Sequence, residues 1–206
     1  MSGMQIQRVA LLHGVLMSRA TMWPLAARLR KAGFSVSLVG YPSVLGGDGP
    51  ALDSVAEKLR DADAVVAHSL GGLMTLEALR RMPESRLKRL VCLGSPLNGS
   101  AVARMLDAHR WTRPVLGRSM ALLLRGAAPD GRVQVGVIAG TVPRGAGRVI
   151  ARLPAPHDGT VSVAETRASG LADHVEVPAS HVGLLLSREA AAQAIHFLRS
   201  GRFSRA

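Results

Sequence analysis

Ser69 is the residue whose surroundings best fit a nucleophile. It lies in the pentapeptide Ala67-His68-Ser69-Leu70-Gly71, directly after the apolar run 62–66 and before the small and apolar residues 72–79. Small neighbours permit the sharp strand-to-helix turn that leaves a serine hydroxyl exposed at the end of a strand. The G-x-S-x-G pattern also occurs by chance, and Ala67 replaces its first glycine. The rest of the sequence must therefore support the prediction.

A serine hydroxyl needs a base within hydrogen-bond reach, about 2.6 to 3.2 Å, and a group that orients this base. Of the seven histidines, His181 fits the base best because it follows a predicted strand, lies in a short polar turn and precedes a helix. His68 adjoins Ser69, but we expect its side chain to point the opposite way. Asp158 fits the orienting acid because its turn follows another predicted strand. Glu165 is the nearby rival, and Asp158 could instead form only a turn or a helix cap.

Backbone amides at two loops could stabilise negative charge on a substrate oxygen. One is the N–H of Leu70, at the start of the helix after Ser69, and the other is the N–H of Val15, in the loop after the first predicted strand. Apolar side chains at the same rim would suit an acyl chain. We expect Leu16, Met17 and Leu97 to contact the substrate.

Strand-like and helix-like segments alternate along the chain, which predicts an α/β fold with about six mostly parallel strands and helices on both faces. The expected strands are 7–13, 34–39, 64–68, 87–93, 133–139 and 174–177, and the expected helices are 20–31, 48–60, 71–81 and 182–198. Ligands of such sheets bind beyond the carboxyl ends of the strands. The predicted nucleophile, acid, base and amides all follow strands, so we expect them at one rim.

We expect residues 1–206 to form a single domain, because no linker or internal repeat interrupts the chain. The segment 100–132 is long, carries several arginines and is rich in Met and Leu. It could be a helical lid over an apolar groove, or an ordinary crossover helix with extra turns that packs on the core.

The net charge of +12 comes almost entirely from arginines scattered along the sequence. Aromatic residues make up only 3% of the chain, so these arginines do not resemble a stacking platform for nucleic acid. A solvated basic surface is the simplest interpretation, and an anionic membrane surface or an acidic substrate is the alternative. The single cysteine, Cys92, lies in an apolar run and is expected to be a buried structural residue.

No apolar run approaches the roughly 18 residues that span a bilayer. Residues 1–14 lack the charged start and long apolar middle of a signal peptide. These two observations predict a cytoplasmic protein.

The chain resembles the α/β-hydrolase superfamily, in particular small bacterial lipases and esterases and the hydrolases similar to GPI inositol-deacylases. The resemblance runs from about residue 8 to 198 in the order of the family's motifs: 13–14, 67–72, 93–100, 157–162 and 180–183. It implies a minimal form of the fold, with nucleophile Ser69, acid Asp158, base His181 and no metal or organic cofactor. The two antiparallel strands that open larger members are missing.

The sequence thus predicts a serine hydrolase that cleaves carboxylic esters, including lipid-like ones, through an acyl-enzyme. A thioesterase or acyltransferase with the same triad is the second hypothesis, since a triad does not reveal the leaving group. A non-catalytic relative that binds a hydrophobic ligand or a protein is the third, although such a module has no need for all three residues. A nucleic-acid-binding role is suggested by the net charge alone, and we expect no nucleic-acid partner.

Overall fold

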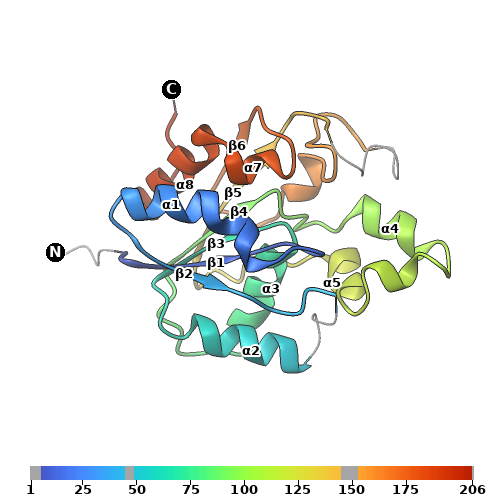
Figure 1. The fold of residues 1–206 in the computed structure, drawn as a ribbon, viewed down its shortest axis with the longest axis horizontal. Helices are drawn as coiled ribbons and strands as arrows, with labels where there is room; N and C mark the ends of the chain where they lie inside the picture. The colour runs from blue at the N-terminus through green and yellow to red at the C-terminus, as the bar shows by residue number, and fades with distance from the viewer. Residues whose placement is uncertain (1–5, 45–48, 145–152, 206) are drawn as a thin grey trace.

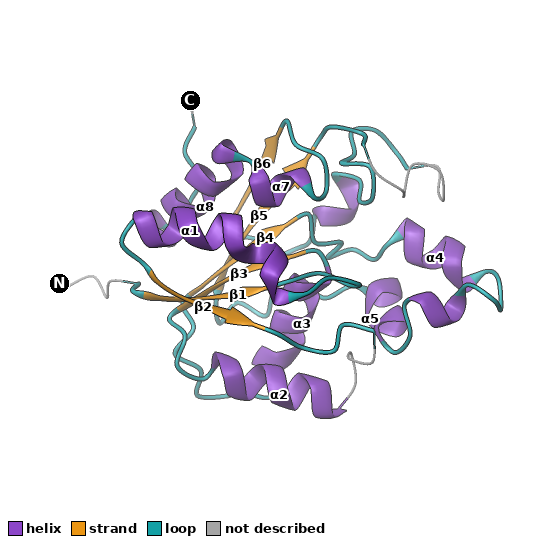
Figure 2. Ribbon diagram, viewed as in Figure 1, coloured by secondary structure: helices purple, strands orange, loops and turns teal. Residues whose placement is uncertain are grey.

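A six-stranded parallel sheet forms the centre of the molecule (Figures 1 and 2), in the order β2-β1-β3-β4-β5-β6. The computed structural model describes residues 6–44, 49–144 and 153–205. The strands are β1 Arg8–Leu12, β2 Ser35–Val39, β3 Ala64–His68, β4 Arg89–Leu93, β5 Gln134–Gly140 and β6 Asp173–Val177. Every neighbouring pair is parallel. The predicted α/β class and its six parallel strands are confirmed.

Helices cover both faces of this sheet, as predicted, and each face has its own apolar core. One face carries α1 Trp23–Lys31, α7 Gly183–Leu186 and α8 Arg188–Ser200, and the other carries α2 Gly49–Leu59, α3 Leu70–Leu79 and α5 Ser119–Arg125. The described part also includes α4 Ala101–Asp107 and the 3₁₀ helices η1 Arg19–Met22, η2 Arg113–Val115 and η3 Ala164–Thr166. The central strand β3 is buried throughout because it packs on both cores.

The long closing helix predicted over 182–198 is wrong, because the chain breaks at Ser187 into α7 and α8. Ser187 has extended backbone angles, and its hydroxyl accepts a hydrogen bond from the N–H of Ala190 at 3.1 Å. A serine that caps a following helix in this way competes with a continuous helical backbone. The break sets α7, which follows His181, apart from the longer α8.

The segment 100–132 divides into two structurally different parts. α5 packs on the core through Met120, Leu122 and Leu123, as a crossover helix would. In α4 only Ala103 is buried, and α4 projects from the body beyond the carboxyl ends of the strands (Figure 1). The crossover interpretation therefore describes α5, whereas α4 and η2 form a projection.

Among the residues that the structure describes, no helix combines the length and the apolar character needed to span a bilayer.

Candidate active site

Ser69 occupies the turn between β3 and α3, where its backbone has φ 54° and ψ −122°. Residues other than glycine rarely adopt positive φ, and such a conformation costs about 1 to 3 kcal/mol. Two backbone hydrogen bonds hold the turn: the N–H of Ser69 donates to the carbonyl of Leu93 at 2.9 Å, and the N–H of Gly72 donates to the carbonyl of Ser69 at 3.1 Å. The serine thus sits directly at the amino end of α3.

His181 and Asp158 form a hydrogen-bonded pair, with 2.6 Å between Nδ1 and Oδ2. The other carboxylate oxygen of Asp158 accepts hydrogen bonds from the N–H groups of Thr160 at 2.8 Å and Val161 at 2.7 Å. These donors fix the orientation of the carboxylate. Because an ionised carboxylate only accepts, Nδ1 of His181 carries the hydrogen and Nε2 keeps a lone pair. Such a ring can act as a base at Nε2.

Gly94, directly after β4, brings this pair close to the serine turn. Its φ is +56°, and a Cβ there would lie 3.0 Å from Oδ2 of Asp158 and 3.1 Å from Nδ1 of His181. The preceding residue, Leu93, accepts the hydrogen bond from Ser69. The backbone of Ser69 thus lies at Leu93 and the Asp158–His181 pair at Gly94, the next residue, although the three come from separate parts of the chain. A side chain at position 94 would displace the pair.

Glu165, the rival acid, is buried but engaged elsewhere. Its Oε2 accepts hydrogen bonds from the N–H of Ser162 at 2.7 Å and from the hydroxyl of Ser162 at 2.9 Å. Its Oε1 accepts from the N–H of Ala101 at the start of α4. The geometry therefore favours Asp158 over Glu165 as the partner of His181. Glu165 instead joins α4 to the loop that carries Asp158, called the acid loop below.

The two predicted oxyanion amides lie at the ends of neighbouring strands. Leu70 is the first residue of α3, and Val15 lies in the loop after β1. Within the described ranges neither N–H donates a hydrogen bond to another protein group. The amino end of α3 adds a partial positive charge at the same place. Both amides thus lack a protein acceptor among the described residues, as an oxyanion hole requires.

The loop that carries Val15 is held by buried ring contacts. The His13 ring stacks on Tyr41 at 4.6 Å, and the Tyr41 hydroxyl donates a hydrogen bond to the carbonyl of His13 at 2.7 Å. Burial lowers the pKa of His13 and raises that of Tyr41. A neutral, packed pair of rings therefore supports the turn on which the Val15 amide depends.

The three apolar residues expected to contact the substrate lie in different surroundings. Leu16 is 65% exposed, and its N–H donates to the hydroxyl of Ser43 at 3.1 Å. Met17 is half-buried, with its sulfur beside Gly14. Leu97 is only 3% exposed and belongs to the core. Its carbonyl accepts a hydrogen bond from the N–H of Ala127 at 3.0 Å. Contact of these three side chains with a substrate stays a prediction.

Sequence reasoning missed His68. Its ring lies against that of His181, with 4.6 Å between centroids, and its Nε2 lies 2.9 Å from the His181 carbonyl oxygen. The side chain therefore points toward the predicted base and not away from it. Alternation along β3 puts position 68 on the face of Ala64 and Val66. The sequence could not reveal that the loop containing His181 covers the same face.

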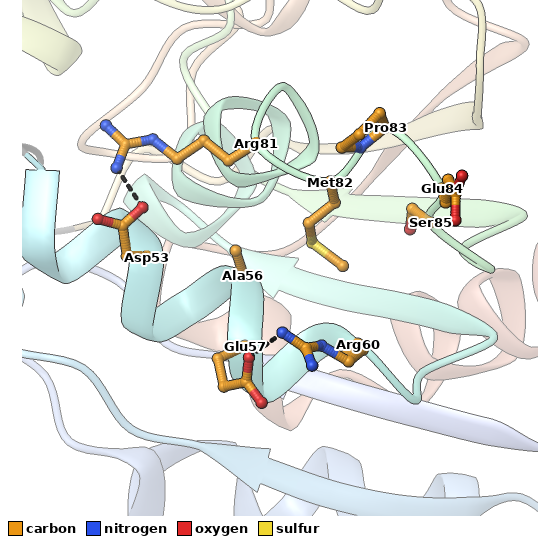
Figure 3. Close-up of a pocket in the computed structure, with 9 residues that line it drawn as sticks. All are labelled: Asp53, Ala56, Glu57, Arg60, Arg81, Met82, Pro83, Glu84 and Ser85. Atoms are coloured by element: carbon orange, nitrogen blue, oxygen red, sulfur yellow. Dashed lines mark hydrogen bonds and ion pairs between the residues drawn. The ribbon is translucent and has the colours of Figure 1, made fainter.

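A surface hollow of about 560 Å³ lies well away from this site, between α2 and the residues after α3 (Figure 3). Since α3 begins beside Ser69, its far end lies about 15 Å away along the helix axis. Four of the charged side chains that line the hollow are paired, Arg81 with Asp53 at 2.6 Å and Arg60 with Glu57. We therefore assign it no chemistry. Among the described residues no cluster of His, Cys, Asp and Glu could hold a metal ion.

Comparison with solved structures identifies the fold. The chain is similar to lipase BlEst2 of Bacillus licheniformis in its mature form, with TM-score 0.74 and 16% identity over 96% of this chain and 94% of that one. It is also similar to carboxylesterase CesB of Bacillus subtilis, with TM-score 0.57 and 17% identity over 97% and 85%. A third similar structure is the pyrethroid hydrolase PytH, with TM-score 0.64 and 16% identity over 94% of this chain and 97% of that one. These neighbours share the α/β-hydrolase fold, which this chain therefore has.

No protein-family model and no curated protein matches the sequence.

Proposed function

We propose that this protein is a serine hydrolase that cleaves carboxylic esters through an acyl-enzyme on Ser69. The observation that carries the proposal is the His181–Asp158 pair, which leaves a lone pair on Nε2 of an imidazole whose carbonyl is bonded by His68, the residue before the strained Ser69 turn. The fold shared with lipases and esterases supports the same conclusion.

In the proposed reaction, Nε2 of His181 takes the proton of the Ser69 hydroxyl while Oγ attacks the acyl carbon. The carbonyl oxygen becomes negative and accepts hydrogen bonds from the amides of Val15 and Leu70. The alcohol then leaves with the proton held by His181, and an acyl-enzyme remains. Water attacks this ester with His181 again as base, which releases the acid and restores the serine.

We propose esters with apolar acyl groups as the substrate class. Leu16 and Met17 adjoin the Val15 amide, where an acyl chain would lie, and the resemblance to lipases and GPI inositol-deacylase-like hydrolases extends the class to lipid-like esters. Acyl thioesters are the second candidate, because the same atoms would cleave them.

The projection, defined as residues 102–115, is proposed as a lid beside the substrate site. Its first end joins the acid loop through Glu165, which accepts a hydrogen bond from Ala101. Its other end joins the Val15 loop through Ser43: the Ser119 hydroxyl donates to the Ser43 carbonyl at 2.6 Å, and the Ser43 hydroxyl accepts from Leu16. The projection thus connects to both sides of the site, and apart from the buried Ala103 its side chains are exposed or half-buried.

We propose an anionic membrane surface as the partner of this projection. Trp111 is 84% exposed, and Met105 and Val115 are also exposed. Three exposed arginines lie in the projection, at positions 104, 110 and 113, against one acid, Asp107, and the exposed Arg118 follows it. Tryptophan favours the membrane interface, and each nearby arginine adds about 1 kcal/mol of attraction to anionic lipid.

A panel of p-nitrophenyl esters of rising chain length, run beside acyl thioesters, tests the substrate proposal. The wild type should hydrolyse the oxygen esters faster, and Ser69→Ala should lose this activity. Faster cleavage of thioesters would favour the second candidate. Equal rates for wild type and Ser69→Ala would exclude both.

A further inference from the structure

His68 belongs to the serine turn and lies against two other segments of the proposed active site, those of His181 and Val15. It is the last residue of β3 and the covalent neighbour of Ser69, so its backbone belongs to the serine turn. Its ring packs on the His181 ring, and its Nε2 is 2.9 Å from the His181 carbonyl oxygen. Its Nδ1 faces Gly14 in the Val15 loop, since a Cβ at position 14 would lie 3.1 Å from that nitrogen and 3.0 Å from Cβ of Ser69.

The hydrogen bonds around His68 define its protonation. A carbonyl oxygen only accepts, so Nε2 of His68 carries the hydrogen and donates it to His181. Nδ1 is buried and has no hydrogen-bond partner among the described residues. Burial, reinforced by the nearby His181 ring, lowers the pKa of His68 to about 3. The ring is therefore a neutral donor at working pH and does not compete with His181 for a proton.

His181 is held at three points, and His68 supplies one of them. The N–H of His181 donates to the Asp158 carbonyl at 2.9 Å, its Nδ1 donates to the Asp158 carboxylate at 2.6 Å, and its carbonyl accepts from His68. Both other restraints come from the acid loop. Only the bond from His68 joins the base directly to the residue next to the nucleophile.

We propose that His68 is a positioning residue that sets the separation and orientation of Ser69 and His181 through its hydrogen bond to the His181 carbonyl. This inference rests on the proposed function. An error of about 1 Å in such a geometry can reduce a rate 100-fold. The His181 carbonyl needs a hydrogen-bond donor at this place. That need explains the buried imidazole of His68 better than packing alone does.

Two substitutions separate the donor from the ring. His68→Phe keeps a planar ring but has no donor. His68→Gln removes the ring and retains an N–H at a comparable distance along the side chain. We expect His68→Phe to lower kcat for a short ester about 10- to 100-fold, with KM within about twofold, because docking of the ester does not involve the His181 carbonyl. His68→Gln should recover most of the loss. A folded His68→Gln no better than His68→Phe, or His68→Phe with unchanged kcat, would overturn the proposal.

Proton and nitrogen NMR provide readouts that need no activity. In the wild type, His68 should be the Nε2–H tautomer and stay neutral down to about pH 4, consistent with its depressed pKa of about 3. The downfield proton shared by His181 and Asp158 should exchange faster in His68→Phe and be retained in His68→Gln. Titration of His68 near neutral pH, or the Nδ1–H tautomer, would exclude its role as the donor even if His68→Phe fails to fold. If the wild type instead lacks ester hydrolysis but gives these spectra, the proposed function fails and the positioning contact stands.

Discussion

At the scale of single residues, the serine turn stores strain that only its surroundings can hold. Ser69 keeps φ at 54° because Leu93 binds its N–H and α3 begins at the next residue. Its Cβ lies 3.0 Å from where a Cβ at Gly14 would be, so the serine faces the loop that follows β1. The proposed chemistry therefore depends on backbone geometry as much as on the three side chains.

Asp158 should be essential for turnover but not for folding. In Asp158→Asn an amide replaces the oxygen that accepts from His181, and an amide donor there would favour the wrong tautomer of the ring. We expect kcat to fall about 10³- to 10⁴-fold, as for an orienting acid in other triads. Circular dichroism and steady-state kinetics measure the two properties.

Glu165→Gln is the matched control for that substitution, because it neutralises a second buried carboxylate in the same loop that does not contact His181. We expect the fold-decrease in kcat for Glu165→Gln to be at least tenfold smaller than that for Asp158→Asn. The reverse ranking, with Asp158→Asn active and Glu165→Gln inactive, would make Glu165 the acid.

The base must be neutral to accept the serine proton, so kcat/KM for a neutral ester should fall as acid protonates His181. A plot of log kcat/KM against pH should have a slope near 1 on its acidic side. A rate that stays constant down to about pH 4, well below the usual histidine range near 6.5, would exclude an imidazole base.

At the scale of elements, the sequence predicts the strands well because the central ones are short apolar runs and the edge strands β2 and β6 alternate polar and apolar residues. β3 coincides with the predicted 64–68, and the other strands differ by one or two residues at their ends. The break at Ser187 was missed because the apolar positions of α7 and α8 follow one helical period across it. The sequence did not show that α5 packs on the core whereas α4 projects from it, because both segments contain Met and Leu.

The triad candidates were predictable for a similar reason, as each follows a strand. What could not be predicted depends on contacts between distant segments. Asp158 and Glu165 lie in one loop, and only the fold shows which carboxylate reaches His181. The burial of Leu97 and the contact of His68 with His181 likewise depend on the packing of segments that are distant in sequence.

The projection gives a prediction about membranes. Trp111→Ala should bind vesicles that contain about one third anionic phospholipid roughly tenfold less tightly than the wild type, because it loses the interfacial tryptophan. Trp23→Ala is the matched control, since Trp23 is also exposed but lies on α1, outside the projection. Vesicle sedimentation measures both.

Wild type should bind purely zwitterionic vesicles much more weakly, because its arginines need anionic lipid. Equal binding of Trp111→Ala and wild type, or equal binding to both kinds of vesicle, would exclude the proposed membrane contact of residues 102–115.

At the scale of the whole molecule, buried neutral histidines make the fold sensitive to acid. Burial lowers the pKa of His68 to about 3 and of His174 to about 4, and also lowers that of His13. Unfolding returns them to about 6.5, so the unfolded chain binds more protons between these values. The free energy of unfolding is therefore highest above about pH 6.5 and decreases as the pH falls toward 4.

Urea unfolding at several pH values measures this dependence. His174→Gln should reduce the slope between about pH 4.5 and 6.5 by up to one proton, because it removes one of the three titrating groups and lies outside the proposed active site. The high net charge of +12 adds repulsion as further groups protonate. A stability that is constant or rises toward acid would contradict the account.

The most direct measurement is the mass of the peptide that contains Ser69 after treatment with a fluorophosphonate ester. The account predicts one adduct per chain, on Ser69, with labelling strongly slowed in His181→Ala, which should still fold. An adduct on another residue, or labelling of Ser69 at an equal rate in wild type and His181→Ala, would contradict the claim that this imidazole activates this hydroxyl.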